Sequence, residues 1–307
     1  MPKPMIALST SWVSKVCRDA DSIVGAITDA GFDTLELSFD LTGKTVDGIL
    51  ALAKKGAVNV VSLHNMCPLP AGVAPEKASP DYFSLSSTDE DERMKAVEVT
   101  RETIRYAHDF RAKAVILHAG RVNVPDRTRE LAGSAVNRDH FEKIKREMIE
   151  SRRRAERPFF EKAIKSLEEL IPCARQYSVA LGIENRYYYR EIPSFDELKA
   201  IFSRFAPGEL FYWHDTGHAE VFDRLGIVAH EDLLKHLADR LLGVHLHDIM
   251  KILDDHKAPL TGTFEFKKLL PFVGKDTIKV LEPHQPATVQ EITRGRDYLE
   301  KLFVRER

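Results

Sequence analysis

The sequence predicts an α/β fold, a (β/α)8 or TIM barrel that forms a single domain over residues 1–307. Short β-branched runs recur eight times along the chain, and charged amphipathic segments separate them. Several runs are apolar at nearly every position, which is typical of parallel strands covered on both faces. The alternative, an open doubly wound sheet, normally carries a glycine-rich phosphate loop after its first strand. This chain has Ser11-Trp12-Val13 there, so the barrel is the better prediction.

The strands and helices can be placed in chain order. The predicted strands are Met5–Thr10, Thr34–Ser38, Val58–His64, Ala114–His118, Val179–Glu184, Leu210–Asp215, Leu242–His247 and Ile278–Glu282. The clearest predicted helices are Ser22–Ala30, Glu92–Asp109, Phe159–Gln176, Ser194–Phe205 and Val289–Leu302. Gly31 and Gly56 each follow a helical segment and precede a strand, where glycine is the residue that most easily closes a helix.

Two stretches interrupt this alternation. Residues 67–89 contain four prolines, and residues 121–157 contain 11 Lys and Arg against 7 Asp and Glu. We expect long loops in both stretches, at the carboxyl end of the barrel, where active sites of such folds are built. For the second stretch the alternative is a solvated helix with Arg152-Arg153-Arg154 on its exposed side.

The composition is that of a soluble globular protein, with 43% hydrophobic and 30% charged residues. No apolar run exceeds five residues, far below the roughly 20 that a membrane-spanning helix needs. Three widely spaced cysteines do not suit a disulfide framework, and the N-terminal apolar stretch is too short for a signal peptide. We therefore expect a cytoplasmic protein. Its formal charge of −2 argues against a surface devoted to nucleic acid.

Six consecutive predicted strands, the third to the eighth, each carry His, Asp or Glu at or near the carboxyl end. The residues are His64, His118, Glu184, Asp215, His245 and Glu282. Strand ends converge at the mouth of a barrel, and crowded, desolvated carboxylates are costly unless a cation neutralises them. This pattern predicts a divalent metal ion. Carboxylate and imidazole ligands without thiolate suit Mn, Zn, Co, Fe or Mg and do not select among them.

A loop after the seventh strand adds two more candidate ligands. Asp254 and His256 are two residues apart, and on an extended loop this spacing places both side chains on the same side.

The strand ends closely resemble those of the xylose isomerase-like TIM barrel superfamily, over nearly the whole chain. The motifs that carry the resemblance are Ile-Glu184-Asn, His-Asp215-Thr-Gly-His, Val-His245-Leu-His-Asp and Leu-Glu282-Pro. The superfamily unites sugar and sugar-phosphate isomerases and epimerases, inosose dehydratase-type lyases and class II AP endonucleases. In its epimerase branch, one divalent ion is held by Glu, Asp, His and Glu from strands five to eight.

The resemblance therefore implies that Glu184, Asp215, His245 and Glu282 bind one divalent ion. It also implies that Glu184 and Glu282 act as acid and base on opposite faces of the substrate. The expected function is a metal-dependent sugar or sugar-phosphate isomerase or epimerase that transfers a proton next to a carbonyl. A related lyase shares the same enolate chemistry and is an alternative.

The AP endonuclease branch is a second alternative, because it uses three zinc ions and nine ligands. The matching residues are His64, His118, Glu184, Asp215, His218, His245, Asp254, His256 and Glu282. The surroundings differ from that branch, since Gly217 stands where a cysteine is usual and Leu246-His247-Asp248 replaces Leu-Asn-Asp. The nearly neutral charge also fits a small substrate better than a duplex. A binding protein that keeps only a relic site is a third alternative.

Some residues beyond the ligands are candidates for substrate contact. Arg121, Arg186 and Lys251 lie just past strand ends and could hold a phosphate or carboxylate, or could be ordinary surface charges. Trp12 could form an apolar wall of the pocket or could pack in the core. We expect a small sugar-like substrate, no nucleic acid and no membrane, and the sequence leaves a homo-oligomer open.

Overall fold

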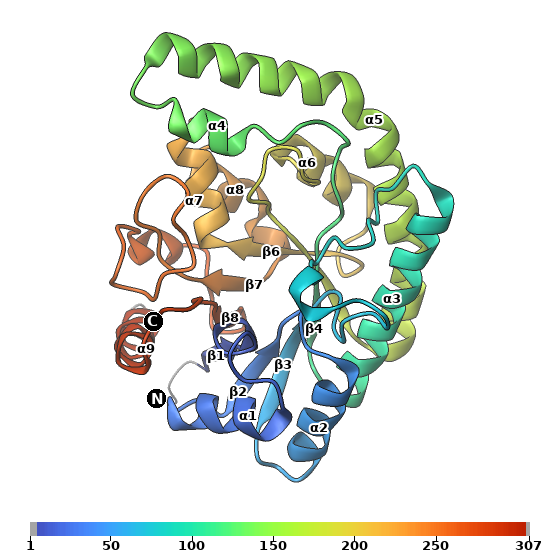
Figure 1. The fold of residues 1–307 in the computed structure, drawn as a ribbon, viewed down its shortest axis with the longest axis vertical. Coiled ribbons are helices and arrows are strands. Elements are labelled where there is room, and N and C mark those ends of the chain that lie inside the picture. The colour runs from blue at the N-terminus through green and yellow to red at the C-terminus, as the bar shows by residue number, and fades with distance from the viewer. Residues whose placement is uncertain (1–4, 305–307) are drawn as a thin grey trace.

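All eight predicted strands are present in the computed structural model, which describes residues 5–304. They are β1 (Ala7–Ser9), β2 (Thr34–Leu37), β3 (Asn59–His64), β4 (Ala114–Leu117), β5 (Ala180–Glu184), β6 (Phe211–Asp215), β7 (Leu241–Leu246) and β8 (Ile278–Leu281). Each strand is parallel to its neighbours in chain order, and β8 pairs with β1. The sheet is therefore a closed barrel, which confirms the predicted fold (Figure 1).

Helices surround the barrel and cover the outer faces of the strands (Figure 1). They are α1 (Ala20–Asp29), α2 (Gly43–Lys54), α3 (Glu90–Asp109), α4 (Thr128–Gly133), α5 (Arg138–Tyr177), α6 (Phe195–Arg204), α7 (Thr216–Arg224), α8 (His230–Leu237) and α9 (Val289–Val304). Side-chain caps start several of them, and α6 begins with a reciprocal capping box between Ser194 and Glu197. No helix among the described residues is long and apolar enough to cross a membrane.

The two stretches that interrupt the alternation differ in structure. Residues 67–89 are almost entirely irregular, as expected, apart from the short 3-10 turn Pro75–Lys77. Residues 121–157 contain α4 and the first half of α5, which extend beyond the barrel (Figure 1). The stretch therefore matches the helical alternative rather than a long loop, and Arg153 and Arg154 are exposed as that alternative predicts. Arg152 is buried rather than exposed, and its Nη2 lies 2.6 Å from Glu197 Oε2. This buried ion pair ties α5 to α6.

The interior of the barrel is filled around one indole ring. Trp213 on β6 is fully buried and packs with Val61, Ile116 and Val280 from other strands. A Cβ atom at Gly243 would lie 2.4 Å from Trp213 Cζ3, so the indole occupies space that only a glycine leaves free. The interior of the barrel is thus filled by side chains, and the residues at the carboxyl ends of the strands lie directly above this packed layer.

Candidate functional site

Four buried ligand residues converge at the carboxyl end of the barrel. Glu184 ends β5, Asp215 ends β6, His245 lies near the end of β7, and Glu282 directly follows β8. Each offers one ligand atom, and these four atoms lie within 4.8 Å of one another. We refer to these four residues as the central group. The closed parallel barrel brings them together because it gathers all strand ends at one rim.

His245 presents one nitrogen to the three carboxylates of this group. Its Nδ1 lies 2.6 Å from Glu184 Oε1, 3.2 Å from Glu282 Oε2 and 3.7 Å from Asp215 Oδ2. Its Nε2 points the other way and lies 2.9 Å from Glu36 Oε1. Nδ1 is therefore the atom of His245 that a bound cation would share with the carboxylates.

The surroundings shift the pKa values of the two glutamates of the central group in opposite directions. Burial raises the pKa of Glu184, but the imidazoles of His245 and His118 outweigh burial and hold that pKa well below its ordinary value. Burial and the nearby carboxylates raise the pKa of Glu282 to about 8. The pKa of His245 lies well above its ordinary value, because the surrounding carboxylates outweigh the effect of burial. The raised pKa values of Glu282 and His245 favour protons on both side chains, which offset part of the negative charge of the metal-free site, and a divalent cation could replace them.

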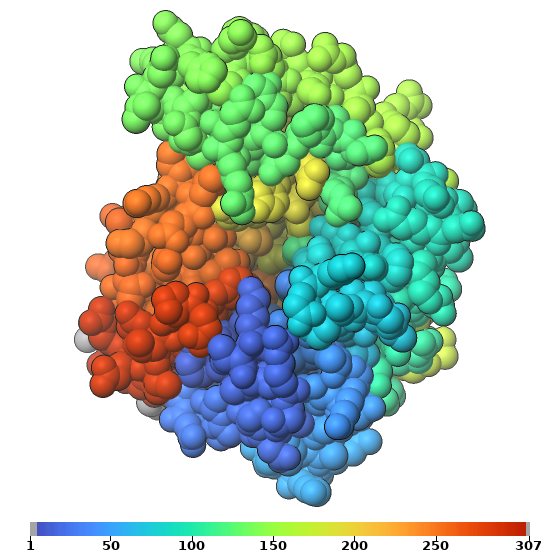
Figure 2. Space-filling view, viewed as in Figure 1, coloured from blue at the N-terminus to red at the C-terminus, as the bar shows by residue number. Residues whose placement is uncertain are grey.

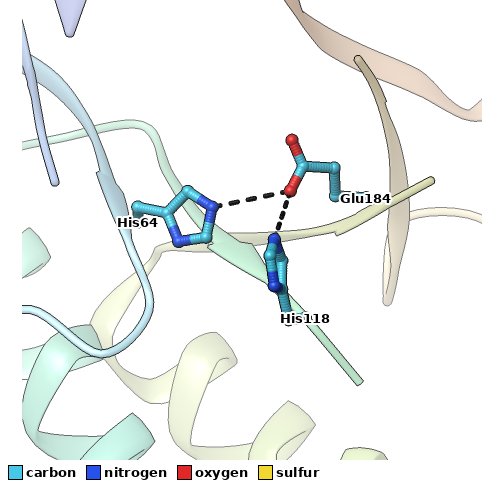
Figure 3. A group of neighbouring side chains, drawn as sticks. All are labelled: His64, His118 and Glu184. Carbon is cyan, nitrogen blue, oxygen red and sulfur yellow. Dashed lines mark hydrogen bonds and ion pairs between the residues drawn. The ribbon is translucent and has the colours of Figure 1, made fainter. Parts of the chain in front are cut away.

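A second group of ligand atoms shares Glu184. Figure 3 shows the rings of His64 and His118 pointing toward one carboxylate oxygen of Glu184. His118 Nε2 lies 2.6 Å and His64 Nε2 3.5 Å from Glu184 Oε2. His64 Nδ1 donates to the carbonyl of Asn65 at 2.9 Å, so its Nε2 carries the lone pair. This orientation fits a metal ligand, which usually donates its other ring nitrogen to a fixed acceptor.

A third group lies on the opposite side of the central group. His218 Nδ1 donates to the carbonyl of Asn185 at 3.0 Å, and His256 Nδ1 donates to that of Glu282 at 2.9 Å. In the neutral rings the lone pairs are then on Nε2, and these atoms lie 4.0 and 3.6 Å from Asp255 Oδ2. That carboxylate oxygen is buried and has no hydrogen-bond partner among the described residues. With neutral imidazoles, His218 Nε2, His256 Nε2 and Asp255 Oδ2 are three acceptor atoms with no hydrogen between them, and such a set could bind a cation.

The loop after β7 corrects one sequence prediction. Asp254 does not join the third group, because its Oδ1 lies 2.8 Å from Lys257 Nζ and its side chain is 45% exposed. The neighbouring Asp255 takes that place instead. The expected two-residue spacing assumed an extended loop, but His256 has a φ of 51°, which turns the backbone so that adjacent residues face the same site.

His247 supports the central group rather than joining it. Its Nδ1 accepts a hydrogen bond from the backbone N–H of His256 at 2.9 Å, so the ring proton lies on Nε2. That Nε2 donates to Asp215 Oδ2 at 2.9 Å. A Cβ atom at Gly217 would lie 2.1 Å from His247 Cε1, so glycine leaves the space that this ring fills. Sequence reasoning named Gly217 only as a departure from the endonuclease pattern.

A cavity of about 460 Å³ opens above these groups. Figure 2 shows a hollow near the centre of the face that Figure 1 presents. Ring and charged side chains line it, among them Phe39, Tyr187, Tyr188, His284, Arg186 and Asp255. Its volume suits a ligand of monosaccharide size. Another cavity of about 460 Å³ opens at the amino ends of β2 and β3, where none of the ligand groups lies.

Of the four residues expected to contact substrate, the structure places only Arg186 in the lining of this cavity. Trp12 packs in the core, and its Nε1 donates to the carbonyl of Ala287 at 2.8 Å. Arg121 Nη1 donates to the carbonyl of Asp81 at 3.2 Å, and Lys251 is exposed. The packing alternative for Trp12 is thus the one that its contacts support.

Arg186 is held between two carboxylates at the wall of the cavity. Its Nη2 lies 2.9 Å from Asp81 Oδ2 and 3.0 Å from Glu191 Oε1. Burial raises the pKa of Asp81, but Arg186 and the neighbouring His118 outweigh burial and hold it well below the ordinary range. The proline-rich loop 67–89 thus delivers a buried carboxylate to the site, which no motif in the sequence indicated.

The comparisons with known proteins agree with this architecture. A D-tagatose 3-epimerase-like protein is 18% identical over 97% of this chain and 96% of its own, with a TM-score of 0.68. An L-ribulose 3-epimerase is 18% identical over 99% and 95%, with a TM-score of 0.65. The 3-keto-D-glucoside 4-epimerase from E. coli is 13% identical over 97% and 100%, with a TM-score of 0.67.

At these identities the likeness shows a shared fold. No curated protein matches the chain significantly in sequence. The family model of the xylose isomerase-like TIM barrel matches residues 24–302, which is most of the chain and confirms the resemblance of the strand-end motifs. The chain therefore belongs to the xylose isomerase-like TIM barrel family.

Proposed function

We propose that this protein is a divalent-metal-dependent sugar isomerase or epimerase. The observation that carries the proposal is the central group, in which His245 Nδ1 and three buried carboxylates converge within 4.8 Å. The names of the similar solved structures, which are sugar epimerases, support a sugar as substrate. The acceptor atoms would suit Mn, Zn, Co, Fe or Mg.

In this proposal the two glutamates divide the proton transfer between them. A bound divalent cation would polarise the substrate carbonyl and stabilise negative charge on its oxygen. One of the two glutamates, Glu184 or Glu282, removes the proton from the carbon next to the carbonyl. The other glutamate gives a proton back. Return to the same carbon is epimerisation, and return to the neighbouring carbon is isomerisation.

The remaining residues of the site hold these groups in place. His118 and His64 point at Glu184 Oε2, while His247 holds Asp215. Arg186 is fixed by Asp81 and Glu191 and lines the cavity, where its guanidinium could donate to a substrate hydroxyl.

The proposal is tested by solvent exchange, which detects proton transfer whatever the product. The manganese-loaded protein is incubated in D2O with a panel of ketoses, aldoses and their phosphates, and each sugar is followed by NMR. We expect deuterium to enter next to the carbonyl of at least one sugar, and a chelator to stop this exchange. No exchange by a protein shown to contain metal would contradict the proposal.

A second candidate function is metal-dependent phosphodiester hydrolysis of the AP endonuclease kind. The observation that favours it is the presence of further ligand groups beside the central one, among them His64 with His118 and His218 with Asp255 and His256. Elemental analysis of freshly purified protein separates the candidates. Three zinc ions per chain and cleavage of abasic DNA would support hydrolysis, whereas one ion per chain supports the sugar chemistry.

A further inference from the structure

Glu36, which the sequence analysis did not single out, lies directly behind the central group. It is on β2 inside the barrel and is fully buried. Its Oε1 lies 2.9 Å from His245 Nε2, and its Oε2 accepts a hydrogen bond from Ser62 Oγ at 2.7 Å. Both carboxylate oxygens are therefore used, one by an imidazole and the other by a hydroxyl.

A metal ligand must be a neutral imidazole, and in the neutral ring of His245 this contact determines which nitrogen carries the lone pair. A carboxylate can only accept, so the hydrogen between Glu36 and His245 lies on Nε2. In the neutral ring Nδ1 is then the unprotonated nitrogen, and it faces Glu184 and Glu282 at 2.6 and 3.2 Å. The opposite tautomer would point an N–H bond at the place where the proposed cation would bind.

The plane of the imidazole is fixed by a different contact. Trp213 packs its edge against His245, with ring centroids 5.2 Å apart and an interplanar angle of 65°. Because the indole holds the ring in place, loss of the Glu36 carboxylate would change the tautomer of His245 more than the position of its ring.

We propose that Glu36 is a positioning residue that fixes His245 in its metal-binding tautomer. This inference rests on the proposed metal site and adds a residue from β2 to a group built from β5 to β8. Partners of this kind orient metal-binding imidazoles, and their loss typically weakens metal affinity about 10- to 100-fold.

The test exchanges one oxygen of Glu36 for an amide nitrogen. The Ser62 hydroxyl has no other acceptor among the described residues, so in Glu36→Gln the amide oxygen should keep the hydrogen bond from Ser62. The NH2 group then faces His245 Nε2 and favours the proton on Nδ1. We expect the affinity for Mn²⁺, measured by calorimetric titration of chelator-treated protein, to fall about 10- to 100-fold. The same variant should also bind Co²⁺ more weakly. The visible absorption of protein-bound Co²⁺ measures this binding independently.

A double variant separates positioning from general damage to the barrel. In Glu36→Gln with Ser62→Ala the hydroxyl is gone, so the amide can turn its oxygen toward His245 and restore the original tautomer. We expect this double variant to regain most of the lost Mn²⁺ affinity, although it has lost more native groups. Ser62→Ala alone is the matched control and should bind Mn²⁺ within a few-fold of wild type. Thermal melts of the metal-free variants establish that each is folded.

Two results would overturn the inference: wild-type affinity in Glu36→Gln, or a double variant that binds no better than the single one. Metal binding is measured without turnover, so failure of the proposed sugar chemistry in a protein that binds Mn²⁺ leaves this test intact. A wild-type protein that binds no divalent metal would overturn the inference and the proposed function together.

Discussion

Glu184 and Glu282 show how identical side chains acquire different properties from their neighbours. Both are buried, and burial alone would raise the pKa of each. Glu184 Oε2 lies 2.6 Å from His118 Nε2 and Glu184 Oε1 lies 2.6 Å from His245 Nδ1, whereas Glu282 Oε2 is 3.2 Å from that same Nδ1. Because both side chains are buried, the number and closeness of imidazoles separates the lowered pKa of Glu184 from the raised pKa of Glu282 in the metal-free protein.

The first prediction concerns the chemical roles of these two residues. Glu184→Gln and Glu282→Gln should each lower the rate of deuterium exchange into substrate by about 10²- to 10⁴-fold, because an amide neither accepts nor returns the proton. Circular dichroism should show an intact fold. Asp254→Asn is the matched control, since its carboxylate lies outside the ligand groups, and it should exchange at nearly the wild-type rate. Near-normal exchange in either glutamine variant would rule out the two-glutamate scheme.

The second prediction is the pH dependence of the metal-free protein. Because the pKa of Glu282 is raised from 4.5 to about 8, the folded state binds a proton that the unfolded chain lacks. The resulting stability is complete below the ordinary value of 4.5 and is lost as the pH rises toward about 8. Urea unfolding across this window should show the free energy of unfolding falling by up to about 1.4 kcal/mol per pH unit from this group. Glu282→Gln should remove that part of the slope, and an unchanged slope would contradict the prediction.

For single residues, the sequence predicts which side chains stand at the strand ends, but not which side chains from other segments contact them. Glu184 and Asp215 could be predicted as candidate ligands because each directly ends a predicted strand. The roles of Glu36, Asp81 and Asp255 depend on contacts between distant segments or on a local turn of the backbone. Neither is encoded in periodicity, so these three residues could be found only in the folded chain.

At the element scale, one carboxylate holds the loop between β7 and β8. Asp248 is 1% exposed, and its two oxygens accept hydrogen bonds from four backbone N–H groups at 2.8–3.0 Å. The donors are Ile249, Leu260, Gly262 and Phe264. This loop carries Asp255 and His256, so the third ligand group depends on a residue that does not belong to it.

The third prediction is that Asp248→Ala loosens this loop. Four backbone N–H groups would lose their acceptor, and two of them, those of Ile249 and Phe264, belong to buried residues. Each buried unsatisfied group costs about 1–3 kcal/mol, so we expect the free energy of unfolding to fall by at least about 2 kcal/mol. Limited proteolysis should cut first within residues 249–264, and His64 and His118 should keep their positions. A variant as stable and as resistant as wild type would show that the loop is held by other contacts.

Where the pattern of neighbouring residues determines a helix or strand, the sequence predicts its bounds to within a few residues. Every predicted strand overlaps an observed one, and the predicted helix Glu92–Asp109 lies within α3. The helix predicted from Phe159 instead begins at Arg138 and runs through Pro158. A proline in a helix interior costs about 3 kcal/mol, so contacts elsewhere must offset it. The buried ion pair of Arg152 is one such contact, and it is invisible in the local sequence.

At the scale of the whole molecule, closure of the barrel has an electrostatic cost. It brings the carboxylates of Glu36, Glu184, Asp215 and Glu282 together, with exposures of 0–7%. Burying like charges side by side is unfavourable, and in the metal-free protein protons and imidazoles compensate only in part. The fold and the proposed cation are therefore linked, since a cation bound by the closed barrel has no equivalent site in the unfolded chain.

The fourth prediction follows from this linkage. A ligand that binds only the folded state at 100 times its dissociation constant adds about 2.7 kcal/mol to the free energy of unfolding. Mn²⁺ at that concentration should therefore raise the melting temperature of chelator-treated protein, and excess chelator should reverse the rise. Asp215→Asn should melt at the same temperature with and without Mn²⁺, because a neutral amide replaces a charged ligand of the central group. An equal rise in wild type and Asp215→Asn would mean that the stabilising cation binds elsewhere, and the central group would then lose its place as the metal site.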